Sequence, residues 1–340
     1  MRRITWVFWS ILAVLALLWL LSEPEAFHIR GIFPARSLLA QLTGVLAIGC
    51  MSLAMLLALR PRWLEAWLDG LDKMYRLHKW LGIGALVLSI LHWLVIKGPK
   101  WAVGWGWITR PAKGGGANLS TLEAFLRSQR GLAESIGEWA FYAAVLLIAL
   151  ALIKRFPYRL FYQSHRLLAL VYLALVAHSL VLLKFSYWTA PVGWVTAALL
   201  AVGSWAALQS LFRRIGTGRR VSGSITGLHY FPGVRSLQVD ARVPGWPGHK
   251  PGQFAFAVSD RSEGFHPYTI ASCWQPQDPQ ISFVVKELGD HTRTLREQLR
   301  VGEKIAVEGP YGCFTFDDDR RRQIWVGGGI GVTPFIARLR

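Results

Sequence analysis

Four histidines stand at near-regular spacing inside two apolar stretches of the chain. His78 and His92 are fourteen residues apart, and His165 and His178 are thirteen apart. Ionisable side chains at membrane depth are costly and usually face a functional interior. One such histidine alone would be interpreted as a helix-end or helix–helix hydrogen-bonding residue. Two pairs at similar spacing favour metal ligation over that structural interpretation.

The spacing predicts two sites rather than one. Fourteen helical residues rise about 21 Å and thirteen rise about 19.5 Å, which excludes His78 and His92 as ligands of one ion. If both helices cross the membrane in the same direction, His78 pairs with His165 and His92 with His178. An ideal helix places His165 and His178 about 140° apart, so a local bend or different rotamers must bring both to the partner helix.

The donor set indicates which metal group these pairs suit. Two imidazoles without a nearby carboxylate or thiolate suit a haem held on both axial sides, whereas zinc usually takes three or four protein ligands. Cys50, Cys273 and Cys313 stand far apart without a CxxC motif, which excludes a disulfide framework, a zinc ribbon and a ferredoxin-type cluster. We therefore expect two stacked b-type haems that form an electron path.

The elements that must position these histidines are apolar helices. Of the 340 residues 53% are hydrophobic and 17% are charged, against about 25% charged in a soluble domain. This composition excludes an ordinary cytosolic enzyme and a disordered chain. Fourteen of the 17 tryptophans precede residue 212 and suit aromatic belts in a lipid bilayer. Six runs approach the roughly 20 residues that span hydrocarbon, at Ile4–Leu21, Ser37–Leu59, His78–Ile96, Ile136–Ile153, His165–Leu183 and Val192–Phe212.

The distribution of basic residues predicts the orientation. With the N-terminus inside, the inner segments carry fifteen Lys and Arg residues and the outer segments nine, which places both termini in the cytoplasm. The net charge of +18 largely reflects this bias, so nucleic acid is rejected as a partner. Arg2 and Arg3 precede the first run as in a signal peptide, but that run is long and SEPEAF is a poor cleavage site. We expect a retained helix.

After Phe212 the sequence is typical of β-structure. SGSITGL, RSLQVDARV, QFAFAVS and ISFVVKEL predict short strands between turns. At the end of the sequence, a predicted strand QIWV leads into the glycines of VGGGIGVTPF, and glycines that open a helix allow close approach of a phosphate. Because a nucleotide-binding domain needs several such units, we expect an incomplete domain, either a fragment of a longer chain or one completed by a separate subunit.

Together these features resemble the NADPH oxidase and ferric reductase superfamily, in a bacterial form. YRLHKWLGIGALVLSILHW resembles its third helix, and HPYTIAS resembles its flavin-binding strand. The resemblance implies a six-helix di-haem membrane domain at 1–216, an antiparallel β-barrel flavin domain at 217–321 and the truncated start of an α/β nucleotide-binding domain at 322–340. It also implies an FAD cofactor and a bacterial inner-membrane location.

The resemblance also assigns site residues. Tyr268 offers a ring to the isoalloxazine and Thr269 a hydroxyl. His266 and Ser272 belong to the same motif. KELGDHTRTLREQL brings a helix N-terminus to the pyrophosphate, which suits an anion, and supplies Lys286, Gly289 and Thr292. KPGQFAF precedes these motifs and VEGPYG follows them as in the family. The nicotinamide nucleotide is assigned to Gly327, Gly328, Gly329 and Gly331.

The expected function is a transmembrane oxidoreductase that carries electrons from NAD(P)H through FAD and two haems to oxygen or a ferric chelate outside. No catalytic residue is identified, although Arg36 is expected to help set the outer site, with a snorkelling arginine as the alternative. Two further alternatives are a haem and flavin subunit that feeds a periplasmic protein and a non-enzymatic scaffold with structural histidines. With an incomplete nucleotide domain, we expect poor reduction by NAD(P)H.

Overall fold

The computed structural model describes residues 2–109, 120–153, 155–258, 264–317 and 322–339. The chain divides into two compact units. The first comprises Met1–Pro61 and Lys73–Ile215, and the second comprises Arg62–Asp72 and Gly216–Arg340. Three basic residues counted for the orientation, Arg110, Lys113 and Lys154, lie outside the described residues.

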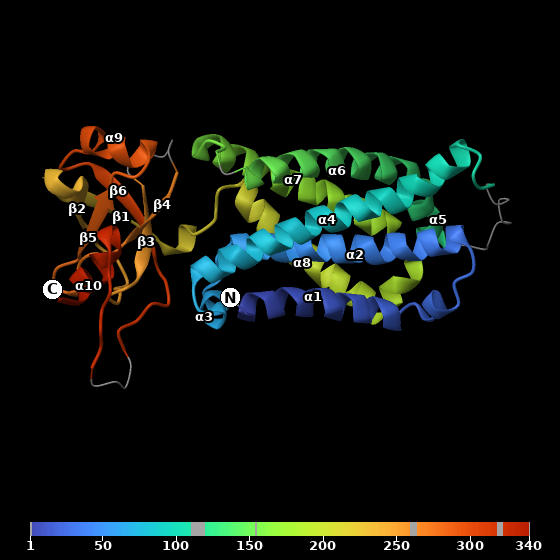
Figure 1. The fold of residues 1–340 in the computed structure, drawn as a ribbon, viewed down its shortest axis with the longest axis horizontal. Helices are drawn as coiled ribbons and strands as arrows, with labels where there is room; N and C mark the ends of the chain where they lie inside the picture. Colours follow the sequence, from blue (N-terminus) through green and yellow to red (C-terminus); the bar gives the residue numbers. More distant parts are fainter. Residues whose placement is uncertain (1, 110–119, 154, 259–263, 318–321, 340) are drawn as a thin grey trace. The chain divides into compact units, whose positions relative to one another are not determined.

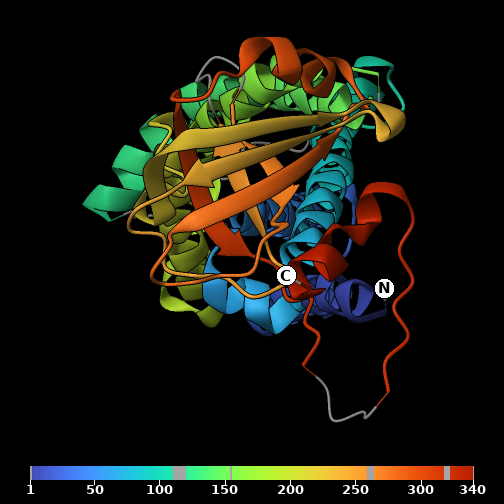
Figure 2. The same ribbon diagram turned by 90° about the vertical axis from the view of Figure 1, so that its left-hand side faces the viewer.

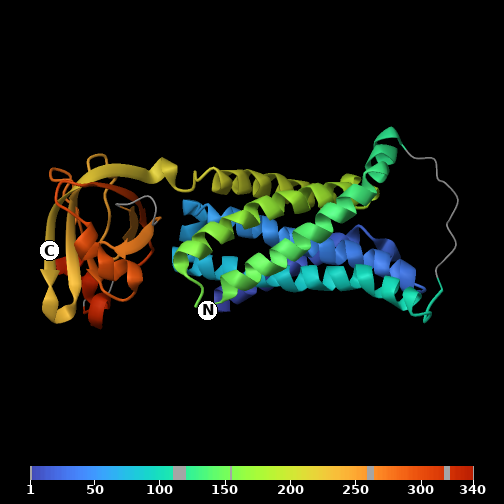
Figure 3. The same ribbon diagram turned by 90° about the horizontal axis from the view of Figure 1, so that it is seen from above.

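Six long helices make up the first unit, and all six are long and apolar enough to cross a membrane. Figures 1 and 3 show them side by side, with α4 and α7 running in the same direction. The expected spans are confirmed, but α4 begins seven residues before His78, so that His78 lies inside the helix and not at its start. The helices are α1 (Arg2–Leu21), α2 (Ile32–Ala58), α4 (Leu71–Gly104), α6 (Arg130–Leu152), α7 (Tyr158–Leu182) and α8 (Pro191–Leu211).

A polar contact inside the bundle connects α2, α7 and α8. The hydroxyls of Tyr172 on α7 and Ser52 on α2 are 2.8 Å apart, and Ser52 also donates to the Ile48 carbonyl. Gly203 on α8 packs so closely on Tyr172 that a Cβ there would collide with its hydroxyl. Small residues and hydroxyl pairs of this kind allow close helix packing in lipid. They fix α7 against α2.

A second polar cluster links the loop between α1 and α2 to the loop between α7 and α8. The buried Glu23 carboxylate accepts hydrogen bonds from Lys184 Nζ at 2.8 Å and Tyr187 Oη at 2.6 Å. Burial, with the Glu23 carboxylate beside it, raises the pKa of Tyr187. Gln41 of α2 donates to the Leu182 carbonyl and accepts from the Lys184 N–H. Because Gln41 satisfies backbone groups at the end of α7, it holds the helix that carries His178.

One antiparallel sheet forms the centre of the second unit, in the order β4-β3-β6-β1-β2-β5, and Figure 2 shows its strong curvature. Helix α9 (Asp290–Gln298) contributes Leu295 to the sheet's core. The expected strands are confirmed as β1 (Arg220–Phe231), β2 (Ser236–Arg242), β3 (Phe254–Val258) and β5 (Gln280–Lys286), joined by β4 (His266–Thr269) and β6 (Lys304–Tyr311).

The expected closed β-barrel is wrong. The edge strands β4 and β5 meet at an isolated bridge between Ile270 and Phe283 and do not form a continuous ladder among the described residues. β4 has only four residues, and Pro267 within it lacks the N–H that a second ladder would need.

Two short helices were not predicted from the sequence. One of them, α3 (Arg62–Leu68), belongs to the second unit. There the Glu65 carboxylate is buried and accepts the Gly312 N–H at 2.7 Å. The other is the amphipathic α5 (Thr121–Ser128), whose Ser120 side chain caps its N-terminus.

The segment around the last glycines differs from the expectation in part. QIWV does not form a strand, and Ile324 and Val326 are 92% and 86% exposed. A parallel strand needs a hydrogen-bonded neighbour, and no other described strand pairs with this segment. The glycines do lead into helical structure, η5 (Gly329–Val332) and α10 (Thr333–Leu339). Trp325 and Phe335 stack with ring centroids 5.6 Å apart.

Candidate functional site

The structure brings the four membrane histidines together as two pairs. The ring centroids of His78 and His165 are 5.9 Å apart, and those of His92 and His178 are 6.4 Å apart. A metal–imidazole bond is about 2 Å long and the nitrogen lies about 1 Å from the ring centre, so two axial imidazoles have centroids roughly 6 Å apart. No group of three or more His, Cys, Asp or Glu ligands occurs among the described residues. Each pair therefore fits a haem better than a protein-only metal site.

Backbone carbonyls determine which nitrogen carries the proton in three of the four rings. Nδ1 of His78 is 2.9 Å from the Ala54 oxygen, Nδ1 of His92 is 3.1 Å from the Ala40 oxygen, and Nδ1 of His178 is 2.8 Å from the Ala133 oxygen. A carbonyl only accepts, so each neutral ring bears its hydrogen on Nδ1. The lone pair is then on Nε2, as in a metal-ligating histidine.

His165 is the exception. Its Nδ1 is buried without a hydrogen-bond partner among the described residues, and its ring stacks on Phe161 at 4.9 Å. Only one imidazole of the His78–His165 pair is thus oriented by a backbone acceptor, whereas both imidazoles of the other pair are.

Glycines make room for the His92–His178 pair. A Cβ at Gly137 on α6 would collide with the His178 ring, and a Cβ at Gly44 on α2 would lie 3.4 Å from the His92 ring. An apolar surface groove lies between α6 and α7, and its wall includes Ile136 and Ala140 near Gly137. The His178 ring thus lies against α6 and also meets His92 of α4. It does so although an ideal helix would point His165 and His178 in directions about 140° apart.

Arg36 lies on α2 beyond the residues that contact His92. Its Nη2 is 3.5 Å from the Ile96 carbonyl, four residues after His92 on α4, and its Nε is buried without a hydrogen-bond partner among the described residues. Arg36, Ala40 and Thr43 are spaced to share one helix face. Arg36 is therefore about one helical turn from the His92–His178 pair.

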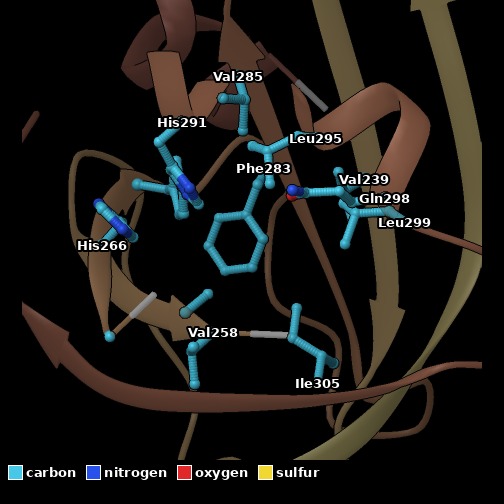
Figure 4. Close-up of a pocket in the computed structure, with 13 residues that line it drawn as sticks. Val239, Val258, His266, Phe283, Val285, His291, Leu295, Gln298, Leu299 and Ile305 are labelled. Carbon is cyan, nitrogen blue, oxygen red and sulfur yellow. The ribbon is translucent and has the colours of Figure 1, made fainter. Parts of the chain in front are cut away.

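Of the expected flavin residues of β4, His266 and Tyr268 border an apolar pocket in the second unit (Figure 4), which Phe283, Val258 and Leu295 also line. The His266 and His291 rings stack at 3.8 Å and 14°. Tyr268 Oη is 3.1 Å from His291 Nε2. His266, Tyr268 and His291 therefore lie together at one edge of this pocket. Their contacts join β4 to the first turn of α9.

The other expected nucleotide contacts are placed as follows. Thr269 pairs with Phe254 of β3, and Ser272 Oγ accepts the Ser282 N–H at 3.1 Å. Thr292 Oγ1 accepts the N–H groups of Leu288 and Gly289, and so closes the turn before α9.

The glycine loop lies close to β5. A Cβ at Gly329 would be 3.8 Å from Lys286 Nζ, and Gly329 has a positive φ of 55°. A Cβ at Gly327 would meet the Phe335 ring, whereas Gly328 and Gly331 have open space around them. Lys286 and Gly329 are therefore neighbours in space, although they are too far apart in sequence for a local motif to show it.

Sequence reasoning missed the groups that orient the ligand candidates. Ala40, Thr43 and Ala133 act through a carbonyl or hydroxyl next to a histidine, which no spacing reveals. Gly44 and Gly137 are isolated glycines inside apolar helices, a signal that often marks a packing constraint. His291 lies within the KELGDHTRTLREQL motif, but its contacts with His266 and Tyr268 of β4 follow only from the fold.

Comparison with known proteins matches both units in order. Residues 43–176 match a ferric reductase like transmembrane component, and residues 237–315 match an FAD-binding domain. The chain belongs to the NADPH oxidase and ferric reductase superfamily. It is therefore a member of a family of membrane oxidoreductases whose flavin-binding domain follows the helices.

Proteins of plants and animals are similar to parts of this chain. Respiratory burst oxidase homolog protein E of Arabidopsis thaliana is 29% identical over 53% of this chain and 21% of its own length. Dual oxidase 2 of Sus scrofa is 26% identical over 79% of this chain and 18% of its own. Ferric reduction oxidase 5 of Arabidopsis thaliana is 39% identical over 22% of this chain and 11% of its own. The chain thus spans about a fifth or less of the length of these relatives.

Proposed function

We propose that this protein passes electrons from NAD(P)H through FAD and two stacked haems to an acceptor on the outer side of the membrane. The acceptor is oxygen, which yields superoxide, or a ferric chelate. The observation that carries the proposal is the pair of histidine–histidine contacts, each at a centroid separation that suits bis-imidazole ligation. His78 and His165 would hold the inner haem, and His92 and His178 the outer haem.

The bound groups supply hydride acceptance at the flavin and one-electron transfer at each haem. The chain's own residues position them. Carbonyls of α2 and α6 orient His78, His92 and His178 with Nε2 available. His78 and His92 are separated by a helix rise of about 21 Å, so the two sites lie at different depths of the bilayer.

On the flavin side, Tyr268 and Thr269 of β4 would meet the isoalloxazine, with His266 and Ser272 from the same motif. The N-terminus of α9, at Gly289 and Thr292, would face the pyrophosphate, because the first N–H groups of a helix attract anions. Lys286 lies near Gly329, where its ammonium group suits a phosphate of the flavin or of the nicotinamide nucleotide.

Arg36 would act near the outer acceptor site. Its Nε is buried without a hydrogen-bond partner among the described residues, so its charge can pair with an anionic group beside the outer haem. We expect Arg36→Ala to slow acceptor reduction and leave haem content unchanged, and Arg36→Lys to retain part of the rate. An unchanged rate in Arg36→Ala would assign Arg36 to membrane-interface snorkelling.

A reduced-minus-oxidised spectrum of the purified protein tests the proposal directly. Two b-type haems per chain are the expected result, reducible by dithionite. The protein is first reduced under anaerobic conditions. Oxygen and a ferric chelate, each added separately to the reduced protein, then identify the acceptor by haem reoxidation. Absence of any b-type signal in protein that retains FAD would remove the proposed electron path and favour the structural-histidine alternative.

A further inference from the structure

Thr43 of α2 lies beside His92, and the proposed electron path gives it no role. Its side chain is in the protein interior, with 9% of the residue exposed. Thr43 Oγ1 is 2.7 Å from the Leu39 carbonyl and 3.1 Å from His92 Nδ1. It therefore contacts one proposed axial ligand and its own helix at the same time.

The protons at this contact can be assigned. A threonine hydroxyl has one hydrogen and two acceptor lone pairs. The shorter contact, to the Leu39 carbonyl, takes that hydrogen because a carbonyl only accepts. The Thr43 oxygen therefore faces His92 as an acceptor. The Ala40 carbonyl is a second acceptor at 3.1 Å, so the His92 Nδ1–H is shared between two oxygens from one turn of α2.

This sharing distinguishes His92 from the other proposed ligands. His78 and His178 each have one carbonyl acceptor at Nδ1, and His165 Nδ1 has none among the described residues. An acceptor at Nδ1 fixes the orientation of a ligating imidazole and raises the basicity of its Nε2. A more basic ligand stabilises the oxidised metal.

We propose that Thr43 is a positioning residue that lowers the reduction potential of the outer haem through the second hydrogen bond to His92. The inference rests on the proposed function, because it requires a haem ligated by His92. It deepens that function by assigning part of the electronic difference between the two sites to one hydroxyl on α2.

Three variants of the full chain test this inference by redox titration of both haems. Thr43→Val removes the acceptor at nearly constant volume, and we expect the midpoint potential of one haem to rise while the other stays unchanged. Thr43→Ser keeps the hydroxyl and should restore the wild-type potential. Thr196→Val is the matched control, because Thr196 on α8 is also buried and donates to its own helix, at the Val192 carbonyl. It should shift neither potential.

The transition that Thr43→Val shifts must be the one that disappears in His92→Leu, which identifies it as the outer haem. The low-spin electron paramagnetic resonance signal of that haem should change in Thr43→Val and return in Thr43→Ser. Two bound haems with unchanged potentials in Thr43→Val would overturn the inference and leave the proposed function standing. Equal shifts in Thr43→Val and Thr196→Val would also overturn it. Wild-type protein that binds no haem would overturn the proposed function, and the inference with it.

Discussion

At the scale of single residues, both imidazoles of the His92–His178 pair are constrained. Each is fixed at Nδ1 by a carbonyl from a helix other than its own. Replacement of either ring therefore removes one ligand from a site whose surroundings are otherwise intact. The effect should be local to one of the two sites.

We expect His92→Leu and His178→Leu each to lose one haem and to leave flavin reduction intact. Pyridine haemochrome analysis against protein concentration gives the haem count, and flavin absorbance gives FAD content. His229→Leu, in β1 of the second unit, is the control and should keep both haems. Two haems per chain in both single variants would contradict the assignment.

Gly137 limits the space next to His178, which leads to a prediction with a control on the same helix. Gly137→Val should displace the His178 ring, since even a Cβ would collide with it, and should reduce outer haem occupancy as strongly as His178→Leu. Gly131→Val on α6 should leave occupancy unchanged, because no atom lies within 4 Å of a Cβ placed there. Equal haem content in the two variants would show that α6 shifts at Gly137 to make room for the larger side chain.

At the scale of elements, the β3–β4 region depends on a histidine that the flavin motif does not include. His249 Nδ1 accepts the indole N–H of Trp246, so its Nε2 carries the hydrogen and donates to the Ser272 carbonyl at 2.9 Å. Burial lowers the pKa of His249 from its usual value of 6.5, and the hydrogen bond to Ser272 offsets only part of that effect. The connection from the core to the end of β4 therefore requires a neutral imidazole.

This gives a pH dependence with a definite sign. The unfolded chain binds the His249 proton more readily than the folded chain does, so this contribution to stability is present above pH 6.5 and falls as the pH drops below it. We expect the temperature of FAD release to decrease between about pH 6.5 and pH 5. In His249→Gln, which does not titrate, this part of the decrease should be absent. An identical acid response in both proteins would contradict the role of His249.

The elements also show how far the sequence could predict this molecule. The six spans follow from apolar length alone, and the histidine pairing follows from their spacing and the shared direction of α4 and α7. Helices α3 and α5 have seven and eight residues, too short for a periodic signal. Whether the barrel closes depends on β4. Pro267 is visible in the sequence, but the short length of the β4 ladder is not. Neighbours such as Thr43, Gly137 and His291 are set by packing, which one-dimensional spacing does not encode.

At the scale of the whole molecule, helix α3 connects distant parts of the sequence. Glu65 is 6% exposed, and its carboxylate accepts the N–H of Gly312, which is 247 residues away in sequence. Gly312 directly follows Tyr311, the last residue of β6. A buried N–H that loses its acceptor costs about 1–3 kcal/mol.

We therefore expect Glu65→Ala to destabilise the flavin-binding unit by about 1–3 kcal/mol and to lower the temperature of FAD release. Glu65→Gln keeps an acceptor oxygen and should remain near wild type. Glu297→Ala, at an exposed position of α9, is the surface control. A Glu65→Ala protein as stable as wild type would show that water replaces the carboxylate.

The same contact sets an order of events during synthesis. Residues 62–72 leave the ribosome well before Gly312, and at about 5–20 residues per second the interval is roughly 12–50 s. Four membrane spans are made in that interval. The flavin-binding unit therefore completes its fold only after the last of them has been synthesised. A shortened chain that starts at Gly216 would lack Glu65. Its Gly312 N–H would then have lost the buried carboxylate that accepts it in the longer chain.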